Sequence, residues 1–203
     1  MKRLFVAVCL LVSAGAAAAQ QPPAPQPQAP LPKGQMPVLG RPTESTDPVP
    51  VFNFDDYFPG AWDFEWNVPE SPIGPAGPVT GTTVYTKVDA TTYDAETKAE
   101  GPAGAFTIKE RMVYDRDAKS ITKQVTDSRG FSYSSKATVA GDLGGIYNIL
   151  FTSDTFVAHG QKVQLKEAVR TMSPFNYRVA TTLSVDGGPF TNFGNPWWRK
   201  QTK

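Results

Sequence analysis

The chain has 203 residues, with 20 basic and 19 acidic side chains, one histidine and one cysteine. A net charge of +1 gives no electrostatic basis for binding nucleic acid or an anionic membrane surface. A single histidine and a single cysteine exclude a metal site built from several such ligands.

Residues 1–19 have the order of properties of a cleaved secretory signal peptide. Lys2 and Arg3 form a positive start, and Leu4–Val12 is an apolar stretch too short to span a bilayer as a helix. A run of alanines then supplies a small-residue cleavage pattern. We therefore expect the mature chain to begin at Gln20.

Two alternatives to cleavage are disfavoured by the same residues. An uncleaved membrane anchor would need a longer apolar stretch, and a lipoprotein would need a small residue where Val8 precedes Cys9. Without residues 1–19 the net charge becomes about −1, and no cysteine remains to form a disulfide. The mature sequence also lacks an N-glycosylation sequon. These features predict a periplasmic or secreted protein with no transmembrane segment in the mature chain.

Residues 20–50 are dominated by proline, glutamine and alanine. Proline fixes φ and removes a backbone donor, so neither a helix nor a sheet can propagate through this stretch. The composition predicts a disordered, extended spacer. A proline-rich docking ligand is the alternative function for it.

Residues 51–203 are expected to form one β domain. Short β-rich segments recur every ten to fourteen residues, and Asp186-Gly187-Gly188 is one of several turn signals between them. Sequential strands without a long crossover predict an all-β fold, a single up-and-down antiparallel barrel of about ten strands, with eight as the alternative count. The expected strands are 60–68, 79–88, 91–99, 105–115, 119–127, 131–140, 146–152, 162–172, 175–185 and 189–199.

Period-two alternation predicts which side chains point inward. In the first strand Trp62, Phe64 and Trp66 share one face. In the ninth, Phe175 and Tyr177 begin the inward face. These aromatic residues are expected to form core.

The stretch from Asn53 to the Gly60-x-Trp62 motif resembles the N-terminal signature of lipocalins and other calycins. The remainder resembles secreted bacterial calycin-like domains of unknown function and, distantly, the nitrobindin and fatty-acid-binding barrels. The resemblance implies a short helix that caps one end of the barrel. It also implies that Gly60 and Trp62 lie at this closed end, beside a basic residue of the last strand, Arg199 or Lys200.

In an up-and-down meander the first strand begins and the tenth ends at the same rim, which independently places Trp62 beside Arg199 or Lys200. A cation over an indole contributes about 0.5–2 kcal/mol. The loops after the odd strands then form the opposite rim, at 69–78, 100–104, 128–130, 153–161 and 186–188. Two of these loops contain the same Gly-Pro-Ala-Gly tetrapeptide, at 74–77 and 101–104, which predicts paired stiff turns at the mouth of the barrel.

Most catalytic motifs are missing from the sequence, and we assign no catalytic residue, metal or cofactor. There is no G-x-S-x-G, no phosphate-binding loop, no dinucleotide fingerprint and no mature cysteine. His159 is expected in an exposed turn between two strands. The nitrobindin resemblance offers axial ligation of haem as the alternative role for it.

Three charged residues fall on the inward phase: Glu110, Lys123 and Glu167. An unpaired buried carboxylate costs several kcal/mol, so each glutamate needs a partner, water or a ligand. An internal Glu110–Lys123 pair, or a bulge that turns one residue outward, would be purely structural. Alternatively, the charges form the polar anchor of a ligand cavity, or the two carboxylates act as acid and base in a glycan- or lipid-acting enzyme.

Together these features favour an exported protein that binds a small, mostly apolar ligand in the barrel, rather than an enzyme. Glu110, Glu167 and Lys123 would orient its polar end, and four aromatic residues would contact its body: Tyr85, Phe106, Tyr133 and Tyr177. The alternative is a structural or protein-interaction module, with a filled interior and an exposed patch near Trp197 or Trp198. The oligomeric state is left open.

Overall fold

The structure is a computed structural model that describes residues 48–202. The predicted signal peptide at 1–19, and all of the predicted spacer except its last three residues, lie outside the described residues. No helix within residues 48–202 is long and apolar enough to cross a membrane.

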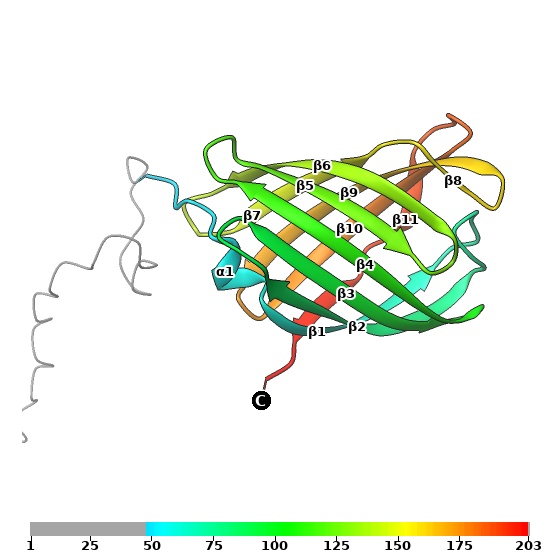
Figure 1. The fold of residues 1–203 in the computed structure, drawn as a ribbon, viewed down its shortest axis with the longest axis horizontal. Coiled ribbons are helices and arrows are strands. Elements are labelled where there is room, and N and C mark those ends of the chain that lie inside the picture. Colours follow the sequence, from blue (N-terminus) through cyan, green and yellow to red (C-terminus); the bar gives the residue numbers. More distant parts are fainter. Residues whose placement is uncertain (1–47, 203) are drawn as a thin grey trace, which may run out of the picture. The chain divides into compact units, whose positions relative to one another are not determined.

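Ten antiparallel strands form a closed ring, to which two short strands are added (Figure 1). β8 (Phe156–Ala158) pairs with β9 (Gln161–Ser173), and β11 (Thr191–Gly194) pairs with β10 (Asn176–Val185). This confirms the predicted all-β, up-and-down barrel. The ring strands, in spatial order, are β1 (Gly60–Val68), β2 (Gly77–Lys87), β3 (Thr92–Gly101), β4 (Gly104–Asp115), β5 (Ser120–Asp127), β6 (Phe131–Gly141), β7 (Tyr147–Ser153), β9 (Gln161–Ser173), β10 (Asn176–Val185) and β12 (Trp197–Lys200).

The last predicted strand, 189–199, is divided in two. Pro196 has no backbone N–H to donate and Gly194 has a φ of +130°, so the ladder breaks between β11 and β12. β11 pairs with Thr181–Leu183 of β10, whereas β12 pairs with Asn176–Arg178 of the same strand. β10 therefore pairs with two short strands, β12 along its first part and β11 along its second.

β1 is held differently along its two halves. Its first half pairs with β12, from Trp62 to Glu65. Beyond that point β12 has ended, and the indole Nε1 of Trp66 donates to the carbonyl of Phe193 in β11, 3.1 Å away. Gly194 makes this approach possible, because a Cβ there would overlap the Trp66 ring. A side chain thus spans the seam between β1 and β11.

A short helix, α1 (Phe54–Tyr57), precedes β1, as predicted, and lies at one end of the barrel in Figure 1. Asn53 caps it by accepting from the backbone N–H of Asp55. Together with the residues on either side, α1 packs four aromatic rings into the end of the barrel, each at most 6% exposed: Phe52, Phe54, Tyr57 and Phe58. This end is closed.

One predicted inward residue is not inside. Phe175 lies in the turn between β9 and β10 and is 62% exposed. The pairing of β9 with β10 shifts register between Asn176 and Tyr177. Alternation therefore holds from Tyr177 onward but not across the turn.

Candidate functional site

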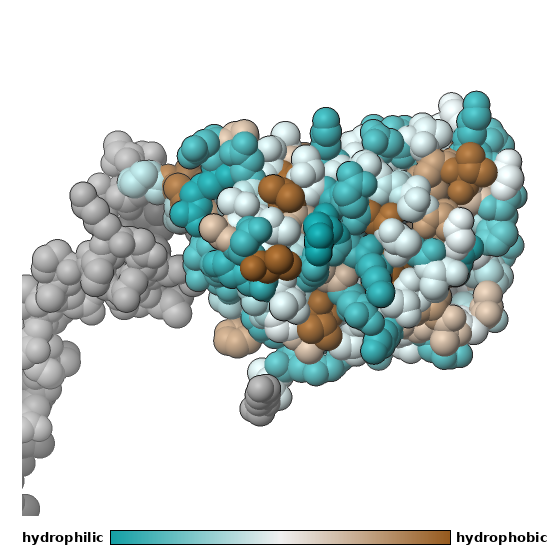
Figure 2. Space-filling view, viewed as in Figure 1, coloured by the Kyte–Doolittle hydropathy of each residue, from teal (hydrophilic) through white to brown (hydrophobic). Residues whose placement is uncertain are grey.

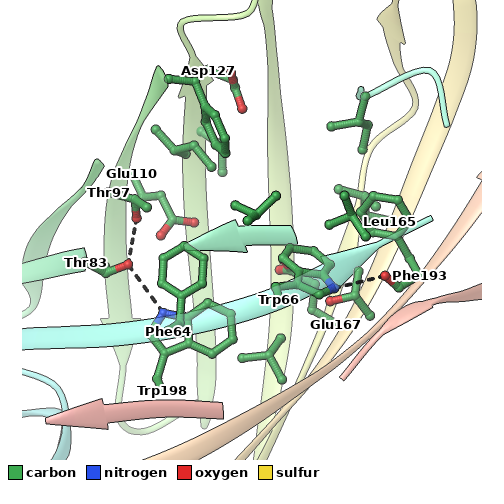
Figure 3. A pocket seen from close by; sticks show the side chains of 18 of the residues that line it. Phe64, Trp66, Thr83, Thr97, Glu110, Asp127, Leu165, Glu167, Phe193 and Trp198 are labelled. Atoms are coloured by element: carbon green, nitrogen blue, oxygen red, sulfur yellow. Dashed lines mark hydrogen bonds between the residues drawn. The ribbon is translucent and has the colours of Figure 1, made fainter. Parts of the chain in front are cut away.

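The barrel is hollow between its closed end and its opposite rim. A cavity of about 220 Å³ runs from the rings of Phe54 and Phe58 to the loops that follow β1, β3 and β5. Apolar cavities of about 150 Å³ already admit a molecule the size of benzene. Figure 3 shows aromatic side chains and three carboxylates, those of Glu110, Asp127 and Glu167, around this space. The interior can therefore hold a small molecule.

A cluster of three charged residues lies on the cavity wall. Lys123 Nζ donates to Glu110 Oε1 at 3.0 Å and to Glu167 Oε2 at 2.7 Å. Glu110 lies on β4, diagonally across from Lys123 on β5, whose direct partner is Met112. Glu167 lies on β9, so Lys123 reaches it past β6 and β7. The structure contains the expected Glu110–Lys123 pair, and the register of β4 is unbroken there, without the alternative bulge.

Lys123 is buried but remains charged. Burial by itself lowers the pKa of Lys123, but the carboxylates of Glu110 and Glu167 outweigh that effect and hold its pKa well above the usual value. Its side chain is 8% exposed, against 15% and 19% for the two glutamates. The ammonium is therefore enclosed, while the carboxylates border open space.

Tyrosine hydroxyls line the cavity beside these charges. The hydroxyls of Tyr85 and Tyr177 are hydrogen-bonded at 2.9 Å, and both rings pack on Phe58 of the closed end. Tyr133 stacks on Phe156 at 4.6 Å. Burial raises the pKa of all three tyrosines, so their hydroxyls are neutral at physiological pH.

Arg129 lies at the open rim. Its guanidinium pairs with Asp127, stacks on the ring of Phe106 at 3.9 Å, and donates to the carbonyl of Ile73 at 3.3 Å. The side chain of Asp127 is 1% exposed. The turn after β5 is thereby tied to the loop after β1, and this ion pair is neutral overall.

The two Gly-Pro-Ala-Gly segments meet at this rim. A Cβ on Gly77 would come within 2.5 Å of the Pro102 ring, so the segments are in close contact and glycine is required at that point. Both segments line the cavity. Two proline-stiffened turns thus form part of the mouth, as the repeated tetrapeptide predicts.

Comparisons with known proteins support the fold. A scan of protein-family models and a search of curated protein sequences each found no match. Among solved structures, the chain is similar to Rv2717c from M. tuberculosis, with a TM-score of 0.60 and 10% sequence identity over 71% of this chain and 93% of that one. A de novo designed fluorescence-activating β-barrel matches with a TM-score of 0.42 and 14% identity, over 74% of this chain and 99% of that one. The first likeness shows that the chain shares a β-barrel fold.

The structure brings the predicted ligand-binding residues to one cavity. All seven line it: Glu110, Glu167, Lys123, Tyr85, Phe106, Tyr133 and Tyr177. They are spread along its length, because Phe106 lies beside Arg129 at the rim, whereas Tyr85 and Tyr177 contact the closed end.

Of the residues predicted for the closed end, Trp62 lies inside the barrel and Arg199 lies on its outer face. Trp62 is fully buried, donates to the carbonyl of Phe58 at 2.7 Å, and has Lys200 Nζ 5.2 Å from its ring. Gly60 adjoins the stem of Lys200. Arg199 is exposed on the outer face, opposite Asp63 in the strand register. Of the two candidate cations, Lys200 is therefore the one beside Trp62.

His159 lies at the rim, outside the cavity, with Nδ1 2.6 Å from the carbonyl oxygen of Pro72. It is exposed and has a φ of +47° in a tight turn. This position gives no support to the alternative in which it ligates a haem inside the barrel.

The two candidate patch residues are on opposite faces of β12. Trp198 points inward, where it stacks on Phe64 and Tyr177. Trp197 points outward, with Arg178 over its ring. On the face shown in Figure 2, hydrophobic residues form separate spots among hydrophilic ones. The hollow interior and the inward orientation of the half-buried Trp198 both disfavour the filled-barrel alternative.

Sequence reasoning missed three parts of the site. Asp127 lies four residues after Lys123 on the same strand and is therefore in phase with it, but the adjoining turn obscures this sign of its inward position. Arg129 lies in the turn itself, where no periodicity applies. Trp198 and the hydrogen-bonded hydroxyls of Thr83 and Thr97 also face the cavity (Figure 3).

The two carboxylates do not form an open acid–base pair. In glycosidases the sugar lies between the two carboxyl groups. Here the ammonium of Lys123 occupies that position, within 3.0 Å of both. The arrangement favours binding over glycan hydrolysis.

Proposed function

We propose that this protein is exported and binds a small, mostly apolar ligand inside its barrel. The cavity of about 220 Å³, with aromatic walls and one cluster of charged groups, carries the proposal. Ligand sites of this kind combine a largely apolar lining with a few placed polar groups.

The proposal includes a calycin-like relationship. The helix that precedes the barrel, the Gly60-x-Trp62 motif and the cation beside Trp62 support it. Export is supported by the signal-like residues 1–19, and places the protein in the periplasm or outside the cell.

Native mass spectrometry of the exported protein tests both parts. We expect a polypeptide mass that begins at Gln20, and a further noncovalent mass of a small molecule. After removal of that molecule, N-phenyl-1-naphthylamine, a neutral apolar dye, should bind in its place and gain fluorescence.

A matched pair of variants distinguishes the cavity from the surface. Ile108→Trp adds volume on the inward face of β4 and should weaken dye binding about tenfold or more. Val113→Trp adds a similar volume on the outward face of the same strand and should leave the affinity for the dye unchanged. Equal dye binding by the two variants would contradict binding in the barrel, and an acylated or uncleaved N-terminus would contradict the export scheme.

A further inference from the structure

The cavity carries an unbalanced charge. Five ionisable residues other than tyrosine line it: Glu110, Lys123, Asp127, Arg129 and Glu167. Asp127 and Arg129 neutralise each other at the rim. The remaining three leave a net charge of −1 deeper in the barrel.

The ammonium of Lys123 is largely engaged. Of its three hydrogens, two are donated, to Glu110 Oε1 and Glu167 Oε2, and Nζ also lies over the ring face of Phe151, 4.6 Å from its centroid. With a side chain that is 8% exposed, the lysine offers little of its positive charge to a ligand.

Each carboxylate, by contrast, retains an oxygen. Glu110 Oε2 and Glu167 Oε1 accept no hydrogen bond from any residue in the 48–202 range. In that same part of the chain no fully buried side-chain nitrogen or oxygen lacks a partner, so these two oxygens must face open space. The charged cluster therefore presents two free carboxylate oxygens to the cavity.

The rest of the wall suits a positive charge. The tyrosine hydroxyls are neutral, because burial raises the pKa of each of them, and so they do not offset the carboxylates. Phe64 and Trp198 form a stacked aromatic pair on the same cavity. Ring faces attract cations, most strongly where water is excluded.

We infer that the cavity selects a small amphiphilic cation, an apolar body with one ammonium group, whose positive end binds the free oxygens of Glu110 and Glu167. This inference rests on the ligand-binding function proposed above and names its substrate class. A bound monocation brings the cluster to electrical neutrality, which is the condition for burying charges without a large cost. A carboxylate of the same shape would meet two like charges.

Three probes with the same phenylpropyl skeleton and different charge test the inference: 3-phenylpropylamine, 3-phenylpropan-1-ol and 3-phenylpropanoate. Isothermal titration at pH 7.5, with dye displacement as a second readout, gives each dissociation constant. We expect the amine to bind about tenfold more tightly than the alcohol, the usual advantage of a hydrogen bond to a charged group, and the acid to bind more weakly than both.

Glu110→Gln makes the cluster neutral while Lys123 keeps Glu167 as its partner. It should lower the amine affinity about tenfold and remove most of the amine's advantage over the alcohol, without a change in the circular dichroism spectrum. Glu65→Gln, the same substitution on the outer face of β1, is the matched control and should change neither affinity.

The outcomes separate this inference from the proposed function. If the neutral dye binds but the amine has no advantage over the alcohol, or if Glu110→Gln and Glu65→Gln behave alike, cation selection is wrong and binding in the barrel stands. If neither the dye nor any of the three probes binds, both fall.

Discussion

The closed end and the cavity share the same ten strands but are filled in opposite ways. At the closed end, Trp62 is 0% exposed and Phe54 is 1% exposed, and both belong to a cluster of packed aromatic rings. A few residues further along the same strands, Glu110 and Glu167 border empty space. The strands contribute inward aromatics to both regions, so aromatic content does not decide which is solid.

What distinguishes the two regions is a segment from outside the barrel wall. Residues 52–58 insert their rings at one end, and Tyr114 and Tyr147 fix the segment by donating to the carbonyls of Phe52 and Pro50. At the other end, the loop after β1 inserts a single aliphatic side chain, Ile73, into a smaller hydrophobic cluster, and Arg129 ties this loop to the turn after β5. We therefore expect substitutions at the closed end to affect stability, and substitutions in the cavity to affect binding as well.

The largest effect is expected for Trp62→Ala. Loss of this fully buried ring, its hydrogen bond to Phe58 and its contact with Lys200 should lower the free energy of unfolding by about 3–5 kcal/mol. Urea denaturation measures it. Trp197→Ala removes a partly exposed indole from the last strand and should cost less than about 1 kcal/mol; similar losses for the two would remove the contrast between core and surface.

Lys123→Met should have an intermediate effect. It leaves Glu110 and Glu167 facing the cavity without a cation, and because both keep some solvent contact we expect a loss of about 2–3 kcal/mol at pH 7. Adding Glu110→Gln to the variant should restore part of the loss. Lys98→Met, on the outer wall, should be nearly neutral in the same urea titration; an equally neutral Lys123→Met would show that the cluster does not stabilise the barrel.

The smallest effect concerns pH at the closed end. Burial and the hydrogen bond to Asp55 raise the pKa of Tyr93 to about 12, above its ordinary value of 10. The folded state holds this proton more tightly than the unfolded state, so its contribution to stability is full below pH 10 and is lost as the pH rises to about 12. Tyr93→Phe should make the fall in urea midpoint over that interval shallower; an unchanged slope would contradict the assignment.

Period-two alternation is sufficient to predict much of this molecule. It places Glu110, Lys123 and Glu167 on the inner wall, and the diagonal relation of neighbouring strands predicts the Glu110–Lys123 contact. The Lys123–Glu167 contact could not be predicted, because it crosses the barrel and depends on how far apart non-adjacent strands lie. The hollow interior could not be predicted for the same reason. It depends on the spacing of non-adjacent strands after the barrel has closed, and not on the pattern of any one strand.

Where the chain leaves the strand pattern, prediction from the sequence fails. Phe175 is next to an inward strand but lies in a turn, so alternation assigns it to the wrong environment. Arg129 is also in a turn, and its contacts with Phe106 and Ile73 come from elements far apart in sequence. Pro196 divides the last predicted strand into two. This division was not predicted, because the aromatic residues around Pro196 have high β propensity and indicate one continuous strand.

The seam between β1 and β11 means that the barrel is held closed differently at its closed end and at its open rim. Near the closed end the ring is continuous through β12, and widening it would break ladder hydrogen bonds between Trp62–Glu65 and their partners. At the rim the same strand is held to β11 by the hydrogen bond of the Trp66 indole and by its packing against the ring of Phe193. Closure of the rim at this seam therefore depends on one side chain, whereas closure of the floor depends on a backbone ladder of four residue pairs.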